Sequence, residues 1–280
     1  MTALDPRIHP FRPEIAASHL KGQVEAERFV AGTRRAVTEP SVLVRRAASH
    51  EAQAVTEALL GEIVTVYEAT EEGWAWGQLA RDGYVGWLGS YALATPGPAP
   101  THTVRVPRTL CFSSADIKQP PLAALPMGAT LTVVKQDARF AVTASGWHVP
   151  AAHLSPLDAR AEDFVAVAEQ FLGAPYLWGG KTMLGIDCSG LVQVALQAAG
   201  IDCPRDSDMQ EAALGQQMPL AGMRRGDLLF WKGHVAIARD AKTILHANAH
   251  AMMVAIEPAK EALARIEAAG GALTRVKRIG

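Results

Sequence analysis

A single cysteine stands between polar residues at the start of an expected helix, in the run GIDCSGLVQVALQAAG from Gly185 to Gly200. Asp187 suits the N-cap position, so Cys188 is expected in the first helical turn. Unpaired backbone N–H groups in that turn carry partial positive charge, which favours a thiolate and lowers the pKa of a thiol. Cys188 is therefore a candidate nucleophile. The alternative is a buried structural cysteine, as expected for Cys111 within the apolar run TLCF.

A nucleophilic thiol needs a base, and the base needs a group that orients it. His234 begins the expected strand HVAIA, and His246 ends the expected strand TILH. If the turn between them centres on Asp240, the two imidazoles lie directly opposite each other on one face, with Cβ atoms about 5 Å apart. A two-residue turn at Asp240–Ala241 would instead place them on opposite faces. His250 is close enough in the sequence to be an alternative orienting residue.

The same part of the chain also allows a metal-binding interpretation. Four of its side chains are ligand types suited to zinc: Cys188, Cys203, His234 and His246. The two cysteines do not form the close Cys-x-x-Cys pair that is usual in structural zinc sites. We therefore expect neither a metal nor a cofactor.

A mixed domain over residues 157–280 must position these side chains, because helical periodicity comes first and a run of strands follows. The spacing of apolar residues predicts helices over 158–173, 188–200 and 258–270. Short apolar runs predict strands over 226–231, 233–239 and 243–249. Helices followed by strands are typical of an α+β fold.

Three smaller segments precede this domain. Residues 1–36 are interpreted as an N-terminal arm packed on the rest, with a short helix expected over 22–32. Two similar stretches, 61–93 and 128–154, each open with Gly, continue through an aromatic-centred strand and close after Gly-Trp. They predict two small β-barrels over 37–96 and 97–156, joined by the linker ATPGPAPTH; two unrelated β-meanders are the alternative.

Composition excludes several classes of protein. A net charge of −1 leaves no basic excess with which to neutralise the phosphates of a nucleic acid. There is no apolar run of the ~18 residues needed to span a membrane. The N-terminal sequence has no secretory signal, which predicts a cytoplasmic location. Three sparse cysteines predict a reducing compartment without disulfides.

One long run carries a specific resemblance. The segment APYLWGGKTMLGIDCSGLVQVALQAAGIDCPRDSDMQ, followed by RRGDLLFW, GHVAIA and ILHA, resembles the NlpC-type cell-wall cysteine peptidases, whose fold is papain-like. The motifs occur in the order and spacing of that family over residues 158–280. The two expected barrels resemble the bacterial SH3-like domains that precede such catalytic domains. The whole arrangement is similar to that of γ-D-glutamyl-L-diamino-acid endopeptidases.

The resemblance implies roles for residues at matching positions. Cys188 matches the nucleophile, His234 the general base and His246 the orienting third member. Tyr176 matches the tyrosine that polarises the scissile carbonyl, and Asp187 the carboxylate that binds a free ammonium. Further polar positions around the substrate match Ser189, Asp206 and Ser207. From the first SH3-like domain, the resemblance implies a pocket wall at Tyr84 and a carboxylate, for which Glu57 is a candidate.

The activity that the resemblance implies is cleavage of the bond between D-glutamate and a diamino acid, such as meso-diaminopimelate, in murein peptides. A free N-terminal L-alanine would be required, and the peptides would come from peptidoglycan recycling. Three alternatives remain: a hydrolase of intact wall, a thiol amidase or acyltransferase on another amide, and a non-catalytic wall-binding module. The expected partner is the murein stem peptide, with no nucleic acid and no membrane.

Overall fold

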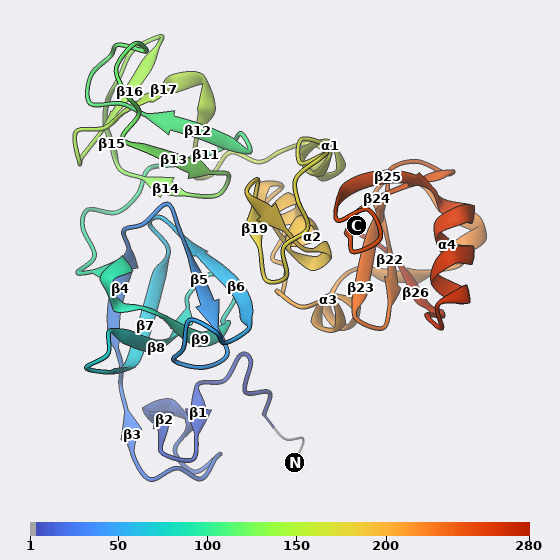
Figure 1. Cartoon of the computed structure of the whole chain (residues 1–280), viewed down its shortest axis with the longest axis horizontal. Coiled ribbons are helices and arrows are strands. Elements are labelled where there is room, and N and C mark those ends of the chain that lie inside the picture. The colour runs from blue at the N-terminus through green and yellow to red at the C-terminus, as the bar shows by residue number, and fades with distance from the viewer. Residues whose placement is uncertain (1–3) are drawn as a thin grey trace. The chain divides into compact units, whose positions relative to one another are not determined.

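The computed structural model describes residues 4–280 and divides into two compact units, Met1–Leu157 and Asp158–Gly280. Figure 1 shows strands throughout the first unit and a mixture of helices and strands in the second. The second unit begins one residue after the expected start of the mixed domain. No helix among residues 4–280 is long and apolar enough to cross a membrane.

The N-terminal segment is extended rather than helical, so the helix expected over 22–32 is wrong. Its strands are β1 (Phe11–Arg12), β2 (Ile15–Ala17) and β3 (Phe29–Val30), with β3 parallel to β2. Positive φ angles at Gly22 and Gly32 turn the chain at either end of the expected helix. Ile15, Ala17 and Leu20 pack in one cluster with three tryptophans of the following barrel: Trp74, Trp76 and Trp87. This packing outweighs the weak helical preference of the segment.

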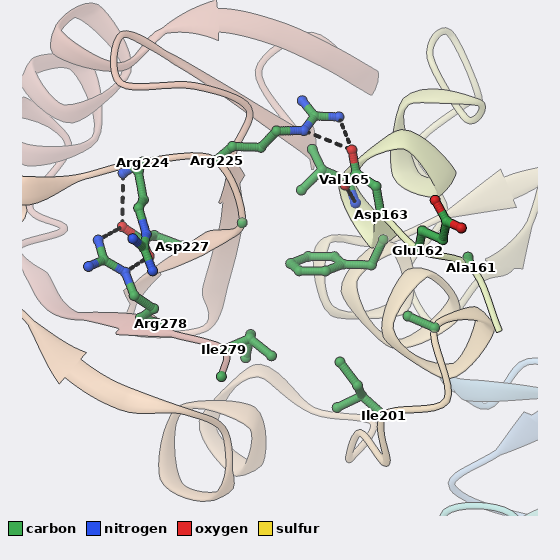
Figure 2. A pocket seen from close by; sticks show the side chains of 14 residues that line it. Ala161, Glu162, Asp163, Val165, Ile201, Arg224, Arg225, Asp227, Arg278 and Ile279 are labelled. Atoms are coloured by element: carbon green, nitrogen blue, oxygen red, sulfur yellow. Dashed lines mark hydrogen bonds and ion pairs between the residues drawn. The ribbon is translucent and has the colours of Figure 1, made fainter.

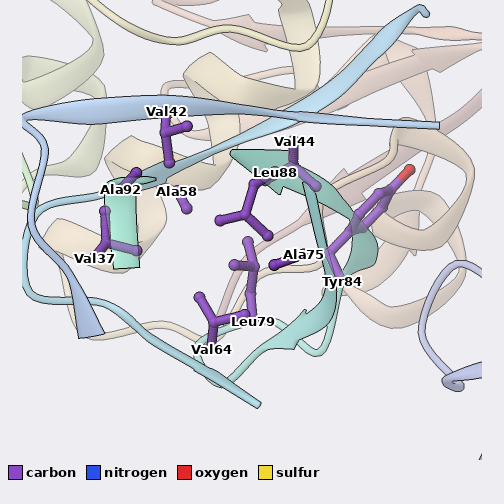
Figure 3. Close-up of a cluster of buried hydrophobic side chains, with 10 residues drawn as sticks. All are labelled: Val37, Val42, Val44, Ala58, Val64, Ala75, Leu79, Tyr84, Leu88 and Ala92. Carbon is purple, nitrogen blue, oxygen red and sulfur yellow. The ribbon is translucent and has the colours of Figure 1, made fainter. Parts of the chain in front are cut away.

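A seven-stranded antiparallel sheet follows, in the order β10-β4-β7-β8-β9-β5-β6. Its strands are β4 (Thr33–Val37), β5 (Ser41–Arg45), β6 (Ala54–Leu59), β7 (Ile63–Ala69), β8 (Trp74–Leu79), β9 (Val85–Gly89) and β10 (Leu93–Ala94). Alternate residues of these strands fill a common core, among them Val42, Val44 and Leu88 (Figure 3).

The remainder of the first unit contains three small antiparallel sheets, ordered β14-β11-β18, β12-β13 and β15-β16-β17. Their strands are β11 (His102–Val104), β12 (Arg108–Cys111), β13 (Ala123–Pro126), β14 (Thr130–Leu131), β15 (Val133–Gln136), β16 (Phe140–Thr143), β17 (His148–Pro150) and β18 (Leu154–Pro156). Cys111 is fully buried in their shared core with Val104, Leu125 and Val149. Cys111 is therefore a structural residue.

The second unit is built on a six-stranded antiparallel sheet, ordered β21-β26-β22-β23-β24-β25. Its strands are β21 (Gln216–Met218), β22 (Asp227–Trp231), β23 (His234–Ala238), β24 (Thr243–Asn248), β25 (Met253–Pro258) and β26 (Leu273–Arg278). A short hairpin of β19 (Lys181–Thr182) and β20 (Gly185–Ile186) precedes the second helix.

Helices cover both sides of this sheet. They are α1 (Phe164–Glu169), α2 (Cys188–Ala198), α3 (Ser207–Ala213) and α4 (Ala259–Ala268). The second helix packs against α1 and against strands β23 and β24, while α4 lies on the opposite side of the strands (Figure 1). Ala259 and Ala262 of α4 share a core with Ala236 and Ile244 of the sheet. The α+β class is confirmed, and α1, α2 and α4 form where helices were expected.

The backbone of α2 approaches the chain before it so closely that one position must be glycine. A Cβ added at Gly190 would lie inside contact distance of the Gly180 carbonyl oxygen and against Oδ1 of Asp187. In an open helix, replacing Gly by Ala gains roughly 0.5–1 kcal/mol. At Gly190 we expect overpacking instead, because the nearest obstacle is backbone and cannot move aside as a side chain would.

Gly190→Ala should therefore lower the free energy of unfolding by about 1–3 kcal/mol, measured by urea denaturation. Gly222→Ala is the matched control, because a Cβ at Gly222 meets no atom within 4 Å. Equal midpoints for Gly190→Ala and the wild type would contradict the predicted close approach.

Candidate active site

Cys188 is the first residue of α2, and the predicted cap is present. Asp187 has extended backbone angles, φ −97° and ψ 178°, and its Oδ1 accepts a 2.7 Å hydrogen bond from the backbone N–H of Gly190. The Cys188 side chain is buried, with 6% of its surface exposed. The residue is thus held at a helix start, as the sequence predicts, but in an enclosed position.

The thiol of Cys188 is not activated in this environment. Burial raises its pKa to about 12, and the nearby Asp187 carboxylate adds to the rise, while the backbone N–H groups of Val235 and Ser189 and the Arg205 guanidinium oppose it. The expectation of a lowered thiol pKa is therefore wrong, because the loss of hydration outweighs the partial charge of the helix start. At neutral pH the sulfur carries its proton.

The two histidines share one face of the sheet, but not in the predicted register. Pairing of Ile237 with Leu245 and of Ala238 with Ile244 centres the hairpin on Ala241 rather than Asp240. His234 and His246 are consequently diagonal neighbours instead of directly opposed. The offset is even, so both rings stay on one side, and His234 Nε2 lies 2.9 Å from His246 Nδ1.

The line of hydrogen bonds continues beyond the histidines to groups that the sequence did not reveal. Nε2 of His246 lies 2.7 Å from Oε1 of Glu257 on β25. Arg265 on α4 donates from Nη2 to both carboxylate oxygens of Glu257, at 2.7 and 2.8 Å. The sequence contained a signal, since Glu257 is an isolated acidic residue in the strand run MVAIEP. Its partner depends on the register of β24 with β25, which pairs His246 with Ala255.

Burial also governs both imidazoles. It lowers the pKa of His234 to about 3, and the adjacent His246 lowers it further. Burial lowers the pKa of His246 as well, although hydrogen bonding to Glu257 works in the opposite direction. For Glu257, burial pushes the pKa upward, but hydrogen bonds from Arg265 and His246 outweigh it and leave the pKa below its usual range. At neutral pH the two rings are neutral and the Glu257 carboxylate is charged.

The link between thiol and histidines runs through the backbone of β23. Helix α2 packs on this strand, and the N–H of Val235, the residue after His234, points to the sulfur of Cys188. Trp231, which pairs with His234 across the β22–β23 turn, places its ring against the imidazole at a centroid distance of 5.5 Å. This contact limits rotation of the His234 ring.

Tyr176 lies close to the thiol, as its matching position implies. Burial raises the pKa of its phenol, and the charges of Cys188 and Asp187 raise it further. Its backbone N–H donates to the carbonyl of Met252 at 2.9 Å, and its backbone forms an isolated bridge to Ile186. The phenol therefore remains protonated and can donate a hydrogen bond.

Asp187 is occupied by protein groups. Arg205 donates to both of its carboxylate oxygens, at 2.9 Å to Oδ1 and 2.7 Å to Oδ2, and the backbone N–H of Gly179 donates to Oδ2 at 2.8 Å. The Arg205 side chain is 1% exposed. Asp187 thus caps α2 and neutralises a buried guanidinium, and its role in binding a substrate ammonium stays a prediction. Ser189 belongs to the same cluster, because its hydroxyl accepts from Arg205 at 2.9 Å and donates to Asp187 at 3.3 Å.

Four other predicted positions are described each within its own unit. Asp206 occupies the N-cap position of α3 without a side-chain capping hydrogen bond, and half-buried Ser207 is the first residue of that helix. In the first unit, Tyr84 packs in the core of the seven-stranded sheet (Figure 3), and Glu57 is a buried residue of β6. The substrate-binding roles of these residues stay predictions.

The zinc interpretation concerns Cys188, Cys203, His234 and His246. Among residues 4–280, no group of three or more His, Cys, Asp or Glu side chains is arranged to hold a metal ion. The thiol of Cys203 donates to the carbonyl of Pro204 at 3.4 Å, and Cys111, Cys188 and Cys203 form no disulfide.

A cavity of about 390 Å³ lies at the other end of β22 from His234 (Figure 2). Its lining includes two ion pairs, Arg225 with Asp163 and Arg278 with Asp227, and the side chain of Phe164. None of the predicted site residues lines it. Two of its carboxylates, Asp163 and Asp227, are paired with arginines, and we do not include the cavity in the candidate active site.

Two family models match the chain. Residues 173–267 match the model described as the NlpC/P60 family, and residues 44–93 match the bacterial dipeptidyl-peptidase Sh3 domain. A solved NlpC/P60 family protein from Bacillus cereus ATCC 10987 has the same fold, with a TM-score of 0.75 at 20% identity over 88% of this chain and 99% of that one.

Curated relatives are similar over part of their length. The gamma-D-glutamyl-L-lysine dipeptidyl-peptidase of Bacillus subtilis (strain 168) is 34% identical, over 53% of this chain and 52% of the relative. Dipeptidyl-peptidase 6 of Lysinibacillus sphaericus is 38% identical, over 37% and 39%. Peptidoglycan endopeptidase RipB of Mycobacterium tuberculosis (strain CDC 1551 / Oshkosh) is 33% identical, over 32% and 44%. The chain thus spans about half the length of these relatives or less.

The Asp187–Arg205 pair generates a prediction about stability. Arg205→Met removes one partner and leaves a buried carboxylate without its counter-ion, which costs about 3–5 kcal/mol of unfolding free energy. Arg224→Met is the control, because Arg224 is exposed and its substitution should change stability by at most about 0.5 kcal/mol. Urea denaturation of both variants measures the difference. A loss below about 1 kcal/mol for Arg205→Met would contradict the anchoring role.

Proposed function

We propose that this chain is a cysteine peptidase that cleaves the γ-D-glutamyl–diamino acid bond of murein peptides, a proposal supported by the match of residues 173–267 to the NlpC/P60 family model. The diamino acid is meso-diaminopimelate or a similar residue, and the peptide carries a free N-terminal L-alanine. One observation carries the proposal: the Cys188 sulfur lies at the start of α2 against the backbone beside His234, which is hydrogen-bonded to His246. The names of the Bacillus and Lysinibacillus relatives support the dipeptidyl-peptidase activity.

The first step transfers a proton while the sulfur attacks. Because the thiol pKa is about 12, a free thiolate is too scarce at neutral pH to wait for the substrate. His234 therefore takes the proton as Sγ forms a bond to the γ-carbonyl carbon of D-glutamate. The carbonyl electron pair moves to oxygen, and the Tyr176 hydroxyl and the Cys188 backbone N–H stabilise that oxyanion.

The second step releases the diamino acid. The oxyanion collapses, the C–N bond breaks, and the proton held by the His234 imidazolium passes to the leaving amine. A γ-glutamyl thioester remains on Cys188. Water, deprotonated by His234, then attacks the thioester, restores the thiol and releases L-Ala–D-Glu.

The resemblance implies a carboxylate that binds the ammonium of the free amino end. Asp187 matches that position and is paired with Arg205, and we propose that Asp206, directly after Arg205 at the start of α3, contributes to binding the ammonium. Ser207 follows it and supplies a hydroxyl to the peptide. A requirement for a free amino end suits short peptides in recycling, and we propose the cytoplasm as the place of reaction.

A second candidate function is hydrolysis of intact peptidoglycan. It is favoured by similarity to a relative named peptidoglycan endopeptidase. The two functions differ in whether the amino end of the stem peptide must be free. In intact wall the L-alanine nitrogen is acylated, so it carries no ammonium for Asp206 to bind.

Three substrates separate these functions: L-Ala-γ-D-Glu-meso-diaminopimelate, its N-acetylated form and whole sacculi. We expect cleavage of the free tripeptide only, with L-Ala–D-Glu detected by mass spectrometry.

Cys188→Ala should abolish turnover. Asp206→Asn should raise KM for the free peptide by about tenfold or more, since a charge-assisted contact of about 1.5–3 kcal/mol is lost. Release of peptides from sacculi would favour the wall hydrolase, and turnover by Cys188→Ala would overturn both.

A further inference from the structure

We propose that Glu257 and Arg265 are positioning residues that decide which nitrogen of the His234 ring is free to accept the thiol proton. Glu257 acts on His234 through His246, and Arg265 holds the Glu257 carboxylate in place. Part of the test rests on the proposed peptidase function, and part needs no substrate.

The first link is the contact between Glu257 and His246. A charged carboxylate can only accept hydrogen bonds. Oε1 of Glu257 lies 2.7 Å from Nε2 of His246. Nε2 must therefore carry a hydrogen. His246 is neutral because it is buried, with 1% of its surface exposed, so its Nδ1 has a lone pair and no hydrogen.

The hydrogen bond between the two imidazoles then fixes which nitrogen of His234 carries the ring hydrogen. Nδ1 of His246 accepts, so Nε2 of His234, 2.9 Å away, must donate. The His234 ring is also neutral and carries one hydrogen, which is now assigned to Nε2. Nδ1 of His234 is left with its lone pair. It is the nitrogen that can take the proton of Cys188.

The same line can spread the charge that proton transfer creates. When Nδ1 of His234 takes the proton from Sγ, the ring becomes an imidazolium. Its Nε2 proton can then move to Nδ1 of His246, which leaves His234 neutral and places the positive charge on His246 beside the Glu257 carboxylate. One proton enters the line, one crosses between the rings, and no redox partner is needed.

Charged groups around His246 determine whether that charge is tolerated. Glu257 on β25 favours the protonated ring, whereas Arg265 on α4 and His250 after β24 disfavour it. His234 on β23 is a further neighbour that can titrate. Arg265 nevertheless supports the positioning of His234. Its two hydrogen bonds to Glu257 keep the carboxylate charged and oriented toward the His246 imidazole.

Glu257→Gln tests the inference, because an amide can donate as well as accept. Its NH₂ group can turn to Nε2 of His246, which moves the ring hydrogen to Nδ1 and reverses the hydrogen bond to His234. His234 would then hold its hydrogen on Nδ1 and offer no base to the thiol. Glu257→Asp keeps the carboxylate, and Glu261→Gln on the exposed side of α4 is the matched control.

The direct measurement is ¹⁵N NMR of histidine-labelled protein at neutral pH, which distinguishes Nδ1–H from Nε2–H in each ring. We expect Nε2–H for His234 in the wild type, Glu257→Asp and Glu261→Gln, and Nδ1–H in Glu257→Gln. On the tripeptide, kcat of Glu257→Gln should fall by about 10²–10⁴-fold with KM little changed. Glu257→Asp should recover much of that loss.

An unchanged Nε2–H tautomer of His234 in Glu257→Gln, or kcat within twofold of the wild type, would overturn the inference. A fall in activity that follows only a fall in thermal stability, equal in Glu257→Gln and Glu257→Asp, would also overturn it. If the wild type cleaves none of the peptides but the tautomer still reverses in Glu257→Gln, the proposed function fails and the positioning role stands.

Discussion

Burial of the Cys188 sulfur is the constraint from which the rest of the site follows. Removed from water, the thiol keeps its proton at neutral pH, and the partial charge of the helix start is too weak to change that. Burial likewise keeps His234 and His246 neutral. A neutral thiol beside neutral imidazoles can react only if a lone pair of the base already faces it. The direction of the hydrogen bonds along Glu257, His246 and His234 therefore matters more than the charge of the thiol or the imidazoles before substrate binds.

Two carboxylates, Asp187, which is buried, and Glu257, which is partly buried, hold this neutral site in shape, and each is paired with an arginine. On one side Asp187 caps α2 and pairs with Arg205. On the other, Glu257 meets His246 and pairs with Arg265. In both places the positive charge of the guanidinium offsets the negative charge of the carboxylate, and the hydrogen bonds between them hold the carboxylate in position. The nucleophile and its base are thus fixed by strong, directional contacts from different elements, α2 with the segment before α3 and β25 with α4.

Local sequence signals were enough for much of this arrangement. An acidic cap before CSGLVQVAL predicted the start of α2, and apolar runs predicted β22, β23 and β24. The histidine pair was predicted on one face, but its register was wrong because the turn type is set by Asp240, whose Oδ1 accepts from the backbone of Lys242 and Thr243. The expected helix over 22–32 failed because the packing of its strand against tryptophans is not visible locally.

What the sequence did not reveal are the partners distant along the chain. Arg205 meets Asp187 only because the chain after α2 folds back on the helix start, and Glu257 meets His246 only because β25 pairs with β24. Neither contact produces a periodic pattern of residue types in the sequence. Capping alone predicts a lowered thiol pKa, but burial raises it, and burial depends on how the sheet and α2 close over the sulfur.

The most direct test of this account is a pH titration of the Cys188 thiol in the substrate-free protein. The ¹³Cβ shift of labelled cysteine reports deprotonation, and Cys188→Ala identifies the signal. With a pKa near the value of about 12 set by burial, the shift should stay constant from neutral pH to about pH 10. A midpoint at or below neutral pH, with His234 protonated over the same range, would show a resting thiolate–imidazolium pair and contradict the account.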